Sequence, residues 1–400
     1  MMISVDEAYK TVLEHVRTQP PMTVDINRAA GLCLAEDVAS DIDMPPFDKS
    51  AMDGYAVVAK DATVGAELNV IENLAAGYVP MKTVKKRQSS KIMTGASIPP
   101  GADAVVKVED TQELEGGCVM IMKRAKKWLN ICKRAEDFEA GKVVLKKGTA
   151  LRPQEIGILA MVGAQDVDVF SSPTVAIMST GDELVKINKT PRPGQIRDSN
   201  SFSLAAQARQ TGAQVKLLGS ATDRKGKILS LVKKGLKNDI LLISGGVSVG
   251  ERDIVVDTLR EAGVEIFFHK VAIRPGKPIV FGRREDTLVF GLPGNPVATF
   301  VNFELFVRPS IRRMMGFQDI GRTILKARME KGLYRKRTRR EYRPALLRMV
   351  DGRFYVTPVK WHGSADLLGA TRGNSLLILP ERTESISPGD EVDVMVTGEI

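Results

Sequence analysis

The residues from Pro173 to Met315 alternate between short apolar runs and longer amphipathic stretches. Because short apolar runs between turn signals are typical of buried strands, the pattern predicts strands that alternate with helices. Strands are expected at 175–178, 215–219, 239–244 and 264–268, and helices at 200–211, 225–237, 253–262 and 296–315. Since parallel strands need helical crossovers, this rhythm predicts a doubly wound, largely parallel α/β sheet.

The sequence changes character on both sides of this unit, and 400 residues are too many for one ordinary core. A capping box at Ser4–Glu7 precedes an amphipathic helix that ends before Pro20, and strand-like alternation dominates from about 42 to 150 and again beyond Gly316. Residues 151–169 are helix-like and end in a short apolar segment. These changes fit two to four domains, with a β-rich region, an α/β unit and a separate C-terminal β domain that is expected to be a small barrel.

Composition excludes several classes of protein. The 43% hydrophobic and 26% charged residues are ordinary globular values, and no apolar stretch is long enough for a membrane helix. Without a visible signal peptide, we expect a cytoplasmic protein with no membrane contact. Three separated cysteines and three histidines predict neither a zinc site nor a disulfide framework. A divalent metal would therefore be held by carboxylates, which favours magnesium.

The net charge of +10 raises the question of nucleic-acid binding. Aromatic residues are only 5%, and no nucleic-acid-binding motif is present, so we expect no nucleic-acid partner. The basic run from Arg335 to Arg340 is interpreted as a solvated hairpin tip. An enzyme that acts on anionic substrates explains the excess of positive charge equally well.

Three loops follow predicted strands and contain small residues. They are Ser179–Leu184, Ser244–Asp253 and Gly291–Pro296. In open α/β sheets, ligands bind beyond the carboxyl ends of the strands, and free N–H groups at helix starts favour anions. The turn Gly245-Gly246-Val247-Ser248 therefore predicts a phosphate cradle, although a single Gly-Gly turn also serves as an ordinary tight turn. Neither a Walker A nor a GxGxxG motif is present.

Acidic and basic side chains are expected near the same edge. Carboxylates beside a phosphate repel it unless a cation lies between them, so Asp182, Glu183, Asp223 and Asp253 suggest bridging magnesium. For Asp223 and Asp253, helix N-capping is the alternative. The segment His269–Pro278 contains three cationic residues, and Pro275 and Pro278 stiffen its turn. Such a segment suits a multiply charged oxyanion, although a solvated turn remains the alternative.

At these residues the sequence resembles a known family, the molybdopterin molybdenumtransferases, which include the molybdenum-insertion domain of gephyrin. The resemblance covers essentially the whole chain. Its motifs are Pro45–Ala56, Ile92–Ala96, Ser179–Leu184, Ser244–Asp253, Arg274–Pro278 and Gly291–Pro296. The length and order of these motifs make the resemblance highly specific.

The resemblance implies a homodimer of elongated, L-shaped subunits with four domains. These are a linking domain (1–44 with 138–172) that mediates dimerisation, a β-rich inserted domain (45–137), an α/β domain (173–317) that binds molybdopterin, and a C-terminal β-barrel-like domain (318–400). It also implies a reaction: molybdate is inserted into adenylylated molybdopterin, the pyrophosphate link is cleaved with magnesium, and AMP leaves. The molybdopterin adenylyltransferases, which share the α/β module, and the molybdoenzymes or their chaperones are the further partners that it implies.

The resemblance also implies roles for individual residues. The catalytic set is Asp53, Thr94, Glu183, Asp223, Asp253, Lys270, Arg274 and Lys277, with a role for Asp137 at the domain border. Substrate phosphates are expected to bind at Gly245, Gly246 and Ser248, with Pro293 and Pro296 beside them. Molybdate is expected to bind at Arg274, Lys277, Pro278, Arg343 and Ser364. Magnesium is expected to be held by Glu183 and Asp253. Because domains of two subunits face each other in the family, Asp53 and Thr94 are expected to complete a site in trans.

Some positions depart from the family pattern. Arg274 replaces a lysine, so a planar fork replaces a point charge, and Lys49 replaces asparagine or arginine. Cys132 and Ala135 replace arginine and glycine, which weakens the expectation for Asp137. Two other functions remain open: molybdopterin adenylyltransferase activity, and a non-enzymatic scaffold. Sequence does not decide between molybdate and tungstate, nor which metal or recipient enzyme is used.

Overall fold

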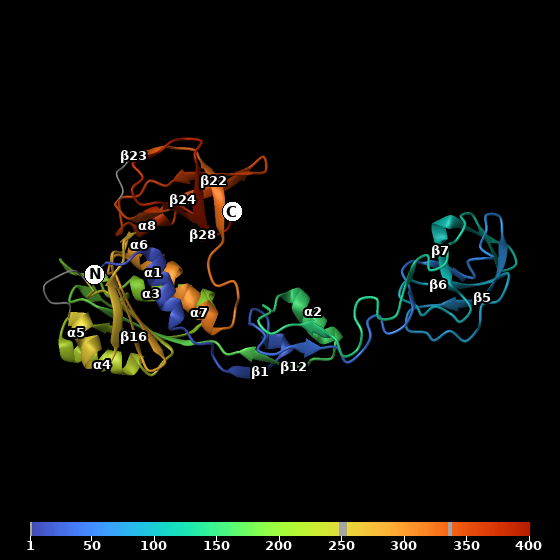
Figure 1. The fold of residues 1–400 in the computed structure, drawn as a ribbon, viewed down its shortest axis with the longest axis horizontal. Helices are drawn as coiled ribbons and strands as arrows, with labels where there is room; N and C mark the ends of the chain where they lie inside the picture. The colour runs from blue at the N-terminus through green and yellow to red at the C-terminus, as the bar shows by residue number, and fades with distance from the viewer. Residues whose placement is uncertain (1, 248–253, 335–337) are drawn as a thin grey trace.

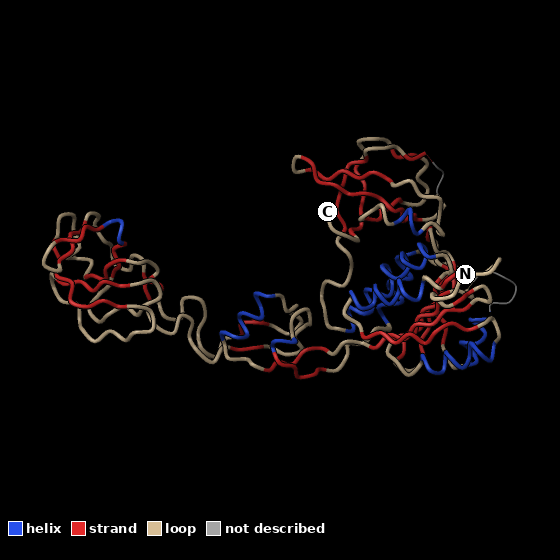
Figure 2. Tube along the Cα trace, turned by 180° about the vertical axis from the view of Figure 1, so that it is seen from behind, coloured by secondary structure: helices blue, strands red, loops and turns tan. Residues whose placement is uncertain are grey.

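The computed structural model describes residues 2–247, 254–334 and 338–400. The chain has an elongated, L-shaped outline, with the α/β domain and the C-terminal domain stacked at one end and a small β-rich domain at the other (Figures 1 and 2). Between the two ends, β1 (Pro21–Asp25) pairs with β12 (Asp166–Phe170) beside α2 (Pro153–Met161). In the described part of the chain, no helix is long and apolar enough to span a membrane.

The α/β domain contains the predicted sheet. Among the described residues its strand order is β16-β13-β17-β21-β20-β18. The strands are β13 (Thr174–Thr180), β16 (Gln214–Ala221), β17 (Ile240–Ser244), β18 (Glu265–Lys270), β20 (Pro278–Arg284) and β21 (Thr287–Leu292). Strands β16, β13, β17 and β21 run parallel, whereas β20 is antiparallel to both of its neighbours. The expected largely parallel sheet is confirmed. The alternating sequence pattern did not predict the antiparallel hairpin formed by β20 and β21.

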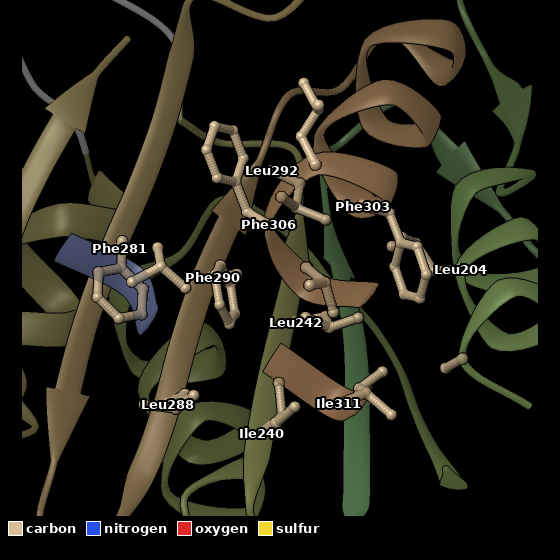
Figure 3. Close-up of a cluster of buried hydrophobic side chains, with 14 of the residues drawn as sticks. Leu204, Ile240, Leu242, Phe281, Leu288, Phe290, Leu292, Phe303, Phe306 and Ile311 are labelled. Atoms are coloured by element: carbon tan, nitrogen blue, oxygen red, sulfur yellow. The ribbon is translucent and has the colours of Figure 1, made fainter. Parts of the chain in front are cut away.

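Each central strand faces two cores, because successive side chains point to opposite faces of a sheet. Ile240 and Leu242 of β17 join one core, and Leu241 and Ile243 join the other. Figure 3 shows the first core, where aromatic side chains pack between the sheet and the helices. The first core is covered by α1 (Val5–Glu14), α3 (Asn200–Gln210), α6 (Pro296–Asn302) and α7 (Arg308–Met314), and the second by α4 (Lys225–Gly235) and α5 (Ile254–Glu261).

Helix α1 begins at the predicted capping box. The Ser4 hydroxyl accepts from Glu7 N at 3.1 Å, and the Glu7 carboxylate accepts from Ser4 N at 2.8 Å. Val5, Ala8 and Val12 of this helix lie in the core of the α/β domain, although we grouped residues 1–44 with the linking domain. The helix therefore packs on the α/β domain, which buries its apolar stripe.

The helix expected at 296–315 is interrupted. After α6, residues Phe303–Val307 form a π-helical turn before α7 begins. Pro309 has no N–H to donate to the carbonyl one turn earlier, and its ring would clash there in a regular α-helix. The wider π turn accommodates this break.

The β-rich domain at the far end contains a sheet of strand order β7-β4-β6-β5-β9-β8 within the described residues. The strands are β4 (Gly54–Val57), β5 (Glu67–Leu74), β6 (Gln88–Ile92), β7 (Ala104–Lys107), β8 (Thr111–Leu114) and β9 (Cys118–Ile121). Its core is separate and small, with Tyr55, Leu68 and Ile121 fully buried.

The C-terminal domain is a barrel, as expected. In the described segments, the strand order β24-β25-β22-β28-β26 closes through a β24–β26 pairing. The strands are β22 (Ile324–Met329), β24 (Arg340–Val350), β25 (Arg353–Pro358), β26 (Ser375–Leu379) and β28 (Glu391–Val396). A sixth strand, β19 (Ile273–Arg274), comes from the α/β domain and pairs in parallel with β24.

The prediction that the basic run from Arg335 to Arg340 forms a solvated hairpin tip is wrong for its last two residues. Residues 335–337 lie outside the described residues, but Arg339 and Arg340 are not a solvated tip. Arg340 makes two 2.7 Å hydrogen bonds to the Asp6 carboxylate of α1, which lowers the pKa of Asp6, and Arg339 donates to Ile273 O at 2.8 Å. These arginines attach the barrel to the α/β domain.

A buried ion pair stabilises the connection between the α/β domain and the barrel. Glu304, in the π-helical turn, accepts from Arg322 Nε at 2.7 Å and from Gln207 Nε2 at 2.8 Å, and its side chain is 1% exposed. Removing one partner leaves a carboxylate buried with less compensation. We predict that Arg322→Ala lowers the free energy of unfolding by about 3 kcal/mol, measured by urea denaturation.

Lys326→Ala is the control, because its 2.9 Å pair with Asp393 lies at the surface. An exposed pair contributes less than about 1 kcal/mol. Equal effects of the two substitutions would contradict the role assigned to burial of Glu304.

Candidate functional site

The three predicted loops leave neighbouring strands at one edge of the sheet. Ser179 of β13 is paired with Ser244 of β17, which in turn is paired with Leu292 of β21. Directly after these positions, Gly245 N donates to Leu292 O at 3.1 Å. The sequence-based expectation that the loops meet at the carboxyl ends of the strands is met.

Gly245 and Gly246 both adopt left-handed backbone conformations, with φ of 91° and 68°. A Cβ at Gly245 would collide with the backbone carbonyl of Thr180, and one at Gly246 would lie 2.5 Å from Thr180 Oγ1. Glycine is thus required by both the dihedral angles and the close approach of β13. Ser248 and Asp253, the other residues predicted for this loop, lie outside the described residues.

Asp198 and Asn200 connect the loops, and sequence reasoning missed both. Asn200 donates from Nδ2 to Ser244 Oγ and to Gly294 O, each at 2.8 Å. Asp198 accepts from Ser179 Oγ at 2.6 Å and from Ser201 Oγ at 2.7 Å. Their position at the start of α3 is a local signal for helix capping only. Their role in joining two loops depends on the fold.

Carboxylates gather beside the first loop. Asp182 Oδ1 accepts from Asp223 N at 3.1 Å, and the Glu183 carboxylate lies against Gly181. Arg224, not Asp223, occupies the N-cap position of α4, so the capping alternative does not explain Asp223. Among the residues with described placement, no three metal-ligating side chains form a cluster, but this set does not include Asp253.

The cationic loop folds against the barrel. Pairing of β19 with β24 sets Arg274 opposite Glu341, whose buried carboxylate lies 3.9 Å from both Arg274 Nε and Arg343 Nη1. Gly276 has a φ of 98° and packs directly on Asn302 of α6. Lys277 O accepts from Val271 N at 3.0 Å, which closes the turn, and Pro278 begins β20. Lys270 ends β18.

Two further residues complete this corner of the molecule. Ser364, from the barrel, accepts from Asn295 Nδ2 at 2.9 Å, and its carbonyl accepts from Val297 N at 3.0 Å. Ser364 therefore lies at the start of α6, where it contacts the two residues on either side of Pro296. Trp361 lies beside Arg343, whose guanidinium carbon is 5.8 Å from the indole centroid. Sequence reasoning did not identify Trp361 or Glu341.

Asp53 and Thr94 are not brought to this site within one chain. They lie in the far β-rich domain, at the opposite end of the molecule from the α/β sheet (Figure 1). Thr94 donates from its backbone N at 2.7 Å and from its hydroxyl at 2.9 Å to Asp53 Oδ1. These bonds hold the pKa of the Asp53 carboxyl below its usual value, with the backbone bond the larger cause.

Apart from Arg274, the departures from the family pattern lie in the β-rich domain and at its border. Cys132 is paired with Lys49 across β10 (Ile131–Cys132) and β3 (Lys49–Ser50). Ala135, where the family usually has glycine, has a φ of 60°, a conformation that costs a residue with a Cβ about 1 kcal/mol. Asp137 is exposed and donates its backbone N–H to Met44 O at 2.9 Å.

Sequence comparison identifies the parts of the chain. Residues 3–163 match the family described as MoeA N-terminal region (domain I and II), residues 176–313 a probable molybdopterin binding domain, and residues 326–397 the MoeA C-terminal region (domain IV). The fold and sequence thus define a multidomain protein built around an α/β domain of the probable molybdopterin-binding class.

Relatives that match along nearly the whole chain identify the family within this class. Molybdopterin molybdenumtransferases from Staphylococcus aureus (strain MRSA252) and Staphylococcus epidermidis (strain ATCC 12228 / FDA PCI 1200) are 34% and 35% identical, covering 99% of this chain and 96% of theirs. The solved molybdopterin biosynthesis moeA protein from Pyrococcus horikoshii OT3 is 31% identical with a TM-score of 0.85, covering 99% of this chain and 100% of its own. The chain belongs to the molybdopterin molybdenumtransferase family.

The conformation of Gly245 yields a first prediction for the site. Gly245→Ala introduces both a left-handed alanine and a collision with Thr180 O, so we expect a clear fall in the melting temperature and at least tenfold weaker phosphate-ester binding. Calorimetry with AMP measures the binding.

Gly194→Ala is the matched control, because Gly194 has a φ of 81° and open space around its Cα. Its cost should be limited to about 1 kcal/mol of backbone strain, with AMP binding unchanged. If Gly245→Ala and Gly194→Ala had equal effects on the melting temperature and on AMP binding, the close approach of Thr180 to Gly245 would not explain the need for glycine.

The Asp53–Thr94 contact yields a pH prediction. Because the folded-state pKa of Asp53 is lowered, its contribution to stability is present above the unfolded pKa and is lost as the pH falls through the folded pKa. We expect Thr94→Val to raise the folded-state pKa of Asp53, so that its contribution to stability becomes smaller and its loss is complete at a higher pH. NMR titration of the Asp53 carboxyl carbon measures the shift, with Thr111→Val as a remote control.

Proposed function

We propose that the chain inserts molybdate into adenylylated molybdopterin, with cleavage of the pyrophosphate link and release of AMP, to give molybdenum cofactor. The observation that carries this proposal is the pairing of β19 with β24. It brings Arg274 of the α/β domain and Arg343 of the barrel to within 3.9 Å of one buried carboxylate, and another barrel residue, Ser364, contacts Asn295 in the loop that contains Gly294. Cations from two domains thus meet at one end of a phosphate-binding edge.

The corner around Arg343 suits a tetrahedral oxyanion. Arg343 Nε and Trp361 Nε1 are buried and have no hydrogen-bond acceptor among the described residues. Ser364 supplies a hydroxyl nearby, and Arg274, Lys277 and Pro278 belong to the turn on the opposite side. Donors on two walls, with a positive balance of charge, would hold molybdate as a substrate by charge-assisted hydrogen bonds.

The neighbouring glycine loop would hold the pyrophosphate. Gly246 is partly exposed at the carboxyl edge, Gly245 lies buried beside it, and Ser248 follows in the same loop. Pro293 and Pro296 border it, because Asn200 ties Gly294 O to Ser244. The phosphate oxygens of adenylylated molybdopterin would therefore lie between β17 and β21, next to the oxyanion corner.

The carboxylates at this edge fit a magnesium ion. Glu183 lies against Gly181, which follows the Thr180 that approaches Gly245 and Gly246, and Asp253 follows the glycine loop in sequence. Magnesium is commonly held by one or two carboxylates together with substrate phosphates. When bound, magnesium would neutralise charge on the departing phosphate. Asp223 would orient its water ligands, and Lys270 would add positive charge at the end of β18. We place no role on Cys33, since burial raises the pKa of its thiol to about 11.

A homodimer would complete the site. Asp53 and Thr94 lie at the far end of the chain, so only a second copy can bring them to the glycine loop. We propose that the β-rich domain of one subunit faces the α/β domain of the other. The enzyme would act in the cytoplasm, receive its substrate from an adenylyltransferase, and deliver its product to molybdoenzymes or their chaperones.

Arg343→Ala tests the oxyanion corner. Losing a charged donor to an oxyanion costs about 1.5–3 kcal/mol, so we expect molybdate to bind at least tenfold more weakly and cofactor formation to fall. Molybdate binding is measured by calorimetry, and cofactor formation by reconstitution of an apo-molybdoenzyme from purified adenylylated molybdopterin.

Arg348→Ala is the control, because Arg348 lies on the same strand but pairs with Glu330 at 2.8 Å on the barrel surface. Unchanged molybdate binding in Arg343→Ala would contradict the proposed corner. Adenylylation of free molybdopterin by the wild type would instead support adenylyltransferase activity, and full cofactor formation by a dimeric Asp253→Ala variant would contradict the magnesium assignment.

A further inference from the structure

The loop that carries Ser364 connects the barrel to the α/β domain. This segment, the Ser364 loop (Trp361–Ala370), lies between β25 and β26 and ends in the short helix α8 (Leu367–Ala370). Trp361 and Leu367 pack against the core of the α/β domain. The loop thus reaches from the barrel to the start of α6, where Ser364 makes its two contacts.

One carboxylate binds both ends of the turn around Ser364. Asp366 Oδ2 accepts from the backbone N–H of His362 at 3.0 Å and lies 3.1 Å from His362 Nδ1. Asp366 Oδ1 accepts from Gly369 N at 2.8 Å, and the Asp366 N–H donates to Gly363 O at 2.9 Å. These contacts enclose Ser364 in a closed turn, because they fix the backbone on both sides of it.

The Asp366 carboxylate is ionised in this turn at neutral pH. The N–H of His362, followed by that of Gly369, holds the pKa of this carboxyl below its ordinary value. Hydrogen bonds to an ionised acceptor are roughly twice as strong as neutral ones. Glycine is required at position 369, because a Cβ there would collide with the Asp366 carboxylate. The carboxylate is therefore occupied by donors of its own loop.

Helix capping alone does not account for these contacts. Asp366 is the N-cap of α8, and its bond from Gly369 N is the ordinary capping bond. The two contacts with His362 lie on the other side of Ser364, outside the helix. Capping needs only the first bond, whereas holding the His362 end determines where Ser364 and the preceding Trp361 lie.

Two donors of the oxyanion corner belong to this loop. Ser364 Oγ accepts from Asn295 Nδ2 at 2.9 Å, so its own hydroxyl hydrogen can be donated to a ligand. Trp361 has a buried indole N–H with no acceptor among the described residues, and its ring lies beside Arg343. The positions of both donors follow from the turn that Asp366 closes.

We propose that Asp366 and His362 are positioning residues for the oxyanion: they hold the Ser364 hydroxyl and the Trp361 indole N–H at a fixed separation for binding molybdate. This inference rests on the proposed function. Donors that are already in place bind an oxyanion more tightly, because less conformational entropy is lost when it binds. Loss of either positioning residue therefore weakens binding without removing a donor.

Asp366→Asn separates positioning from helix capping. Asparagine caps helices as well as aspartate does, so its Oδ1 keeps the bond from Gly369 N. The amide group lacks the second acceptor oxygen and the charge that hold His362. We expect an unchanged melting temperature and unchanged AMP binding by calorimetry, about fivefold weaker molybdate binding, and a matching rise in the KM for molybdate with an unchanged kcat.

Tryptophan fluorescence measures the molybdate affinity at the loop itself. The chain has two tryptophans, and Trp128 lies in the β-rich domain, so Trp361 is the sole reporter in a Trp128→Phe background. Molybdate should change the emission of Trp361, and Asp366→Asn should require about five times more molybdate for the same change. His362→Ala removes only the side-chain contact with Asp366 and should weaken binding less than Asp366→Asn does.

Asp390→Asn is the matched control. The Asp390 carboxylate also accepts a backbone N–H, that of Ser387 at 2.8 Å, but in a different turn of the barrel. Its molybdate affinity should equal that of the wild type.

Equal molybdate affinities of Asp366→Asn and the wild type would overturn the inference and leave Asp366 as a helix cap. A fall in the melting temperature and in AMP binding together with molybdate binding would also overturn it, because the role of Asp366 would then be structural. So would molybdate binding that leaves the emission of Trp361 unchanged. Absence of molybdate binding by the wild type in calorimetry would instead contradict the oxyanion corner and the proposed function, and this inference would fail with them.

Discussion

The pairing of β19 with β24 is the contact on which the rest of the proposed site depends. Two residues of the α/β domain extend the barrel by one strand, and the backbone register then sets Arg274 opposite Glu341. Arg340, one residue earlier on β24, reaches Asp6 of α1. A backbone ladder holds position more strictly than side-chain contacts do, because its register can change only in whole residues. The positions of Arg343 and Ser364 relative to the glycine loop follow from this junction.

The same edge of the sheet gathers groups of opposite charge. Cations of the β19 turn and the barrel lie at one end, and Asp182, Glu183 and Asp223 lie toward the other. Between them, Gly245 and Gly246 place backbone without side chains, with Gly245 buried and Gly246 partly exposed. This distribution suits a long anionic substrate, with one end facing positive charge and the middle held by N–H groups and a cation.

Sequence reasoning succeeded where the signal was local. The capping box of α1, the strands of the sheet and the glycines with left-handed backbone were all visible as short patterns. It failed where a distant partner decided the outcome. Arg340 looks solvated beside other basic residues, but its partner Asp6 lies 334 positions away. Trp361 and Glu341 carry no local signal, and Asn200 carries only that of a helix start, because each acquires its role from a second loop or domain.

The sequence by itself determined the α/β rhythm, the three loops at the strand ends and the family, because these depend on residues that are near neighbours along the chain. Only the tertiary structure decided that Arg274 and Arg343 share a buried carboxylate, that Asp53 lies far from the glycine loop, and that the Ser364 loop of the barrel contacts the start of α6. Those facts depend on how separate cores dock. Docking is set by strand register and the shape of packed surfaces, neither of which is a property of any short segment.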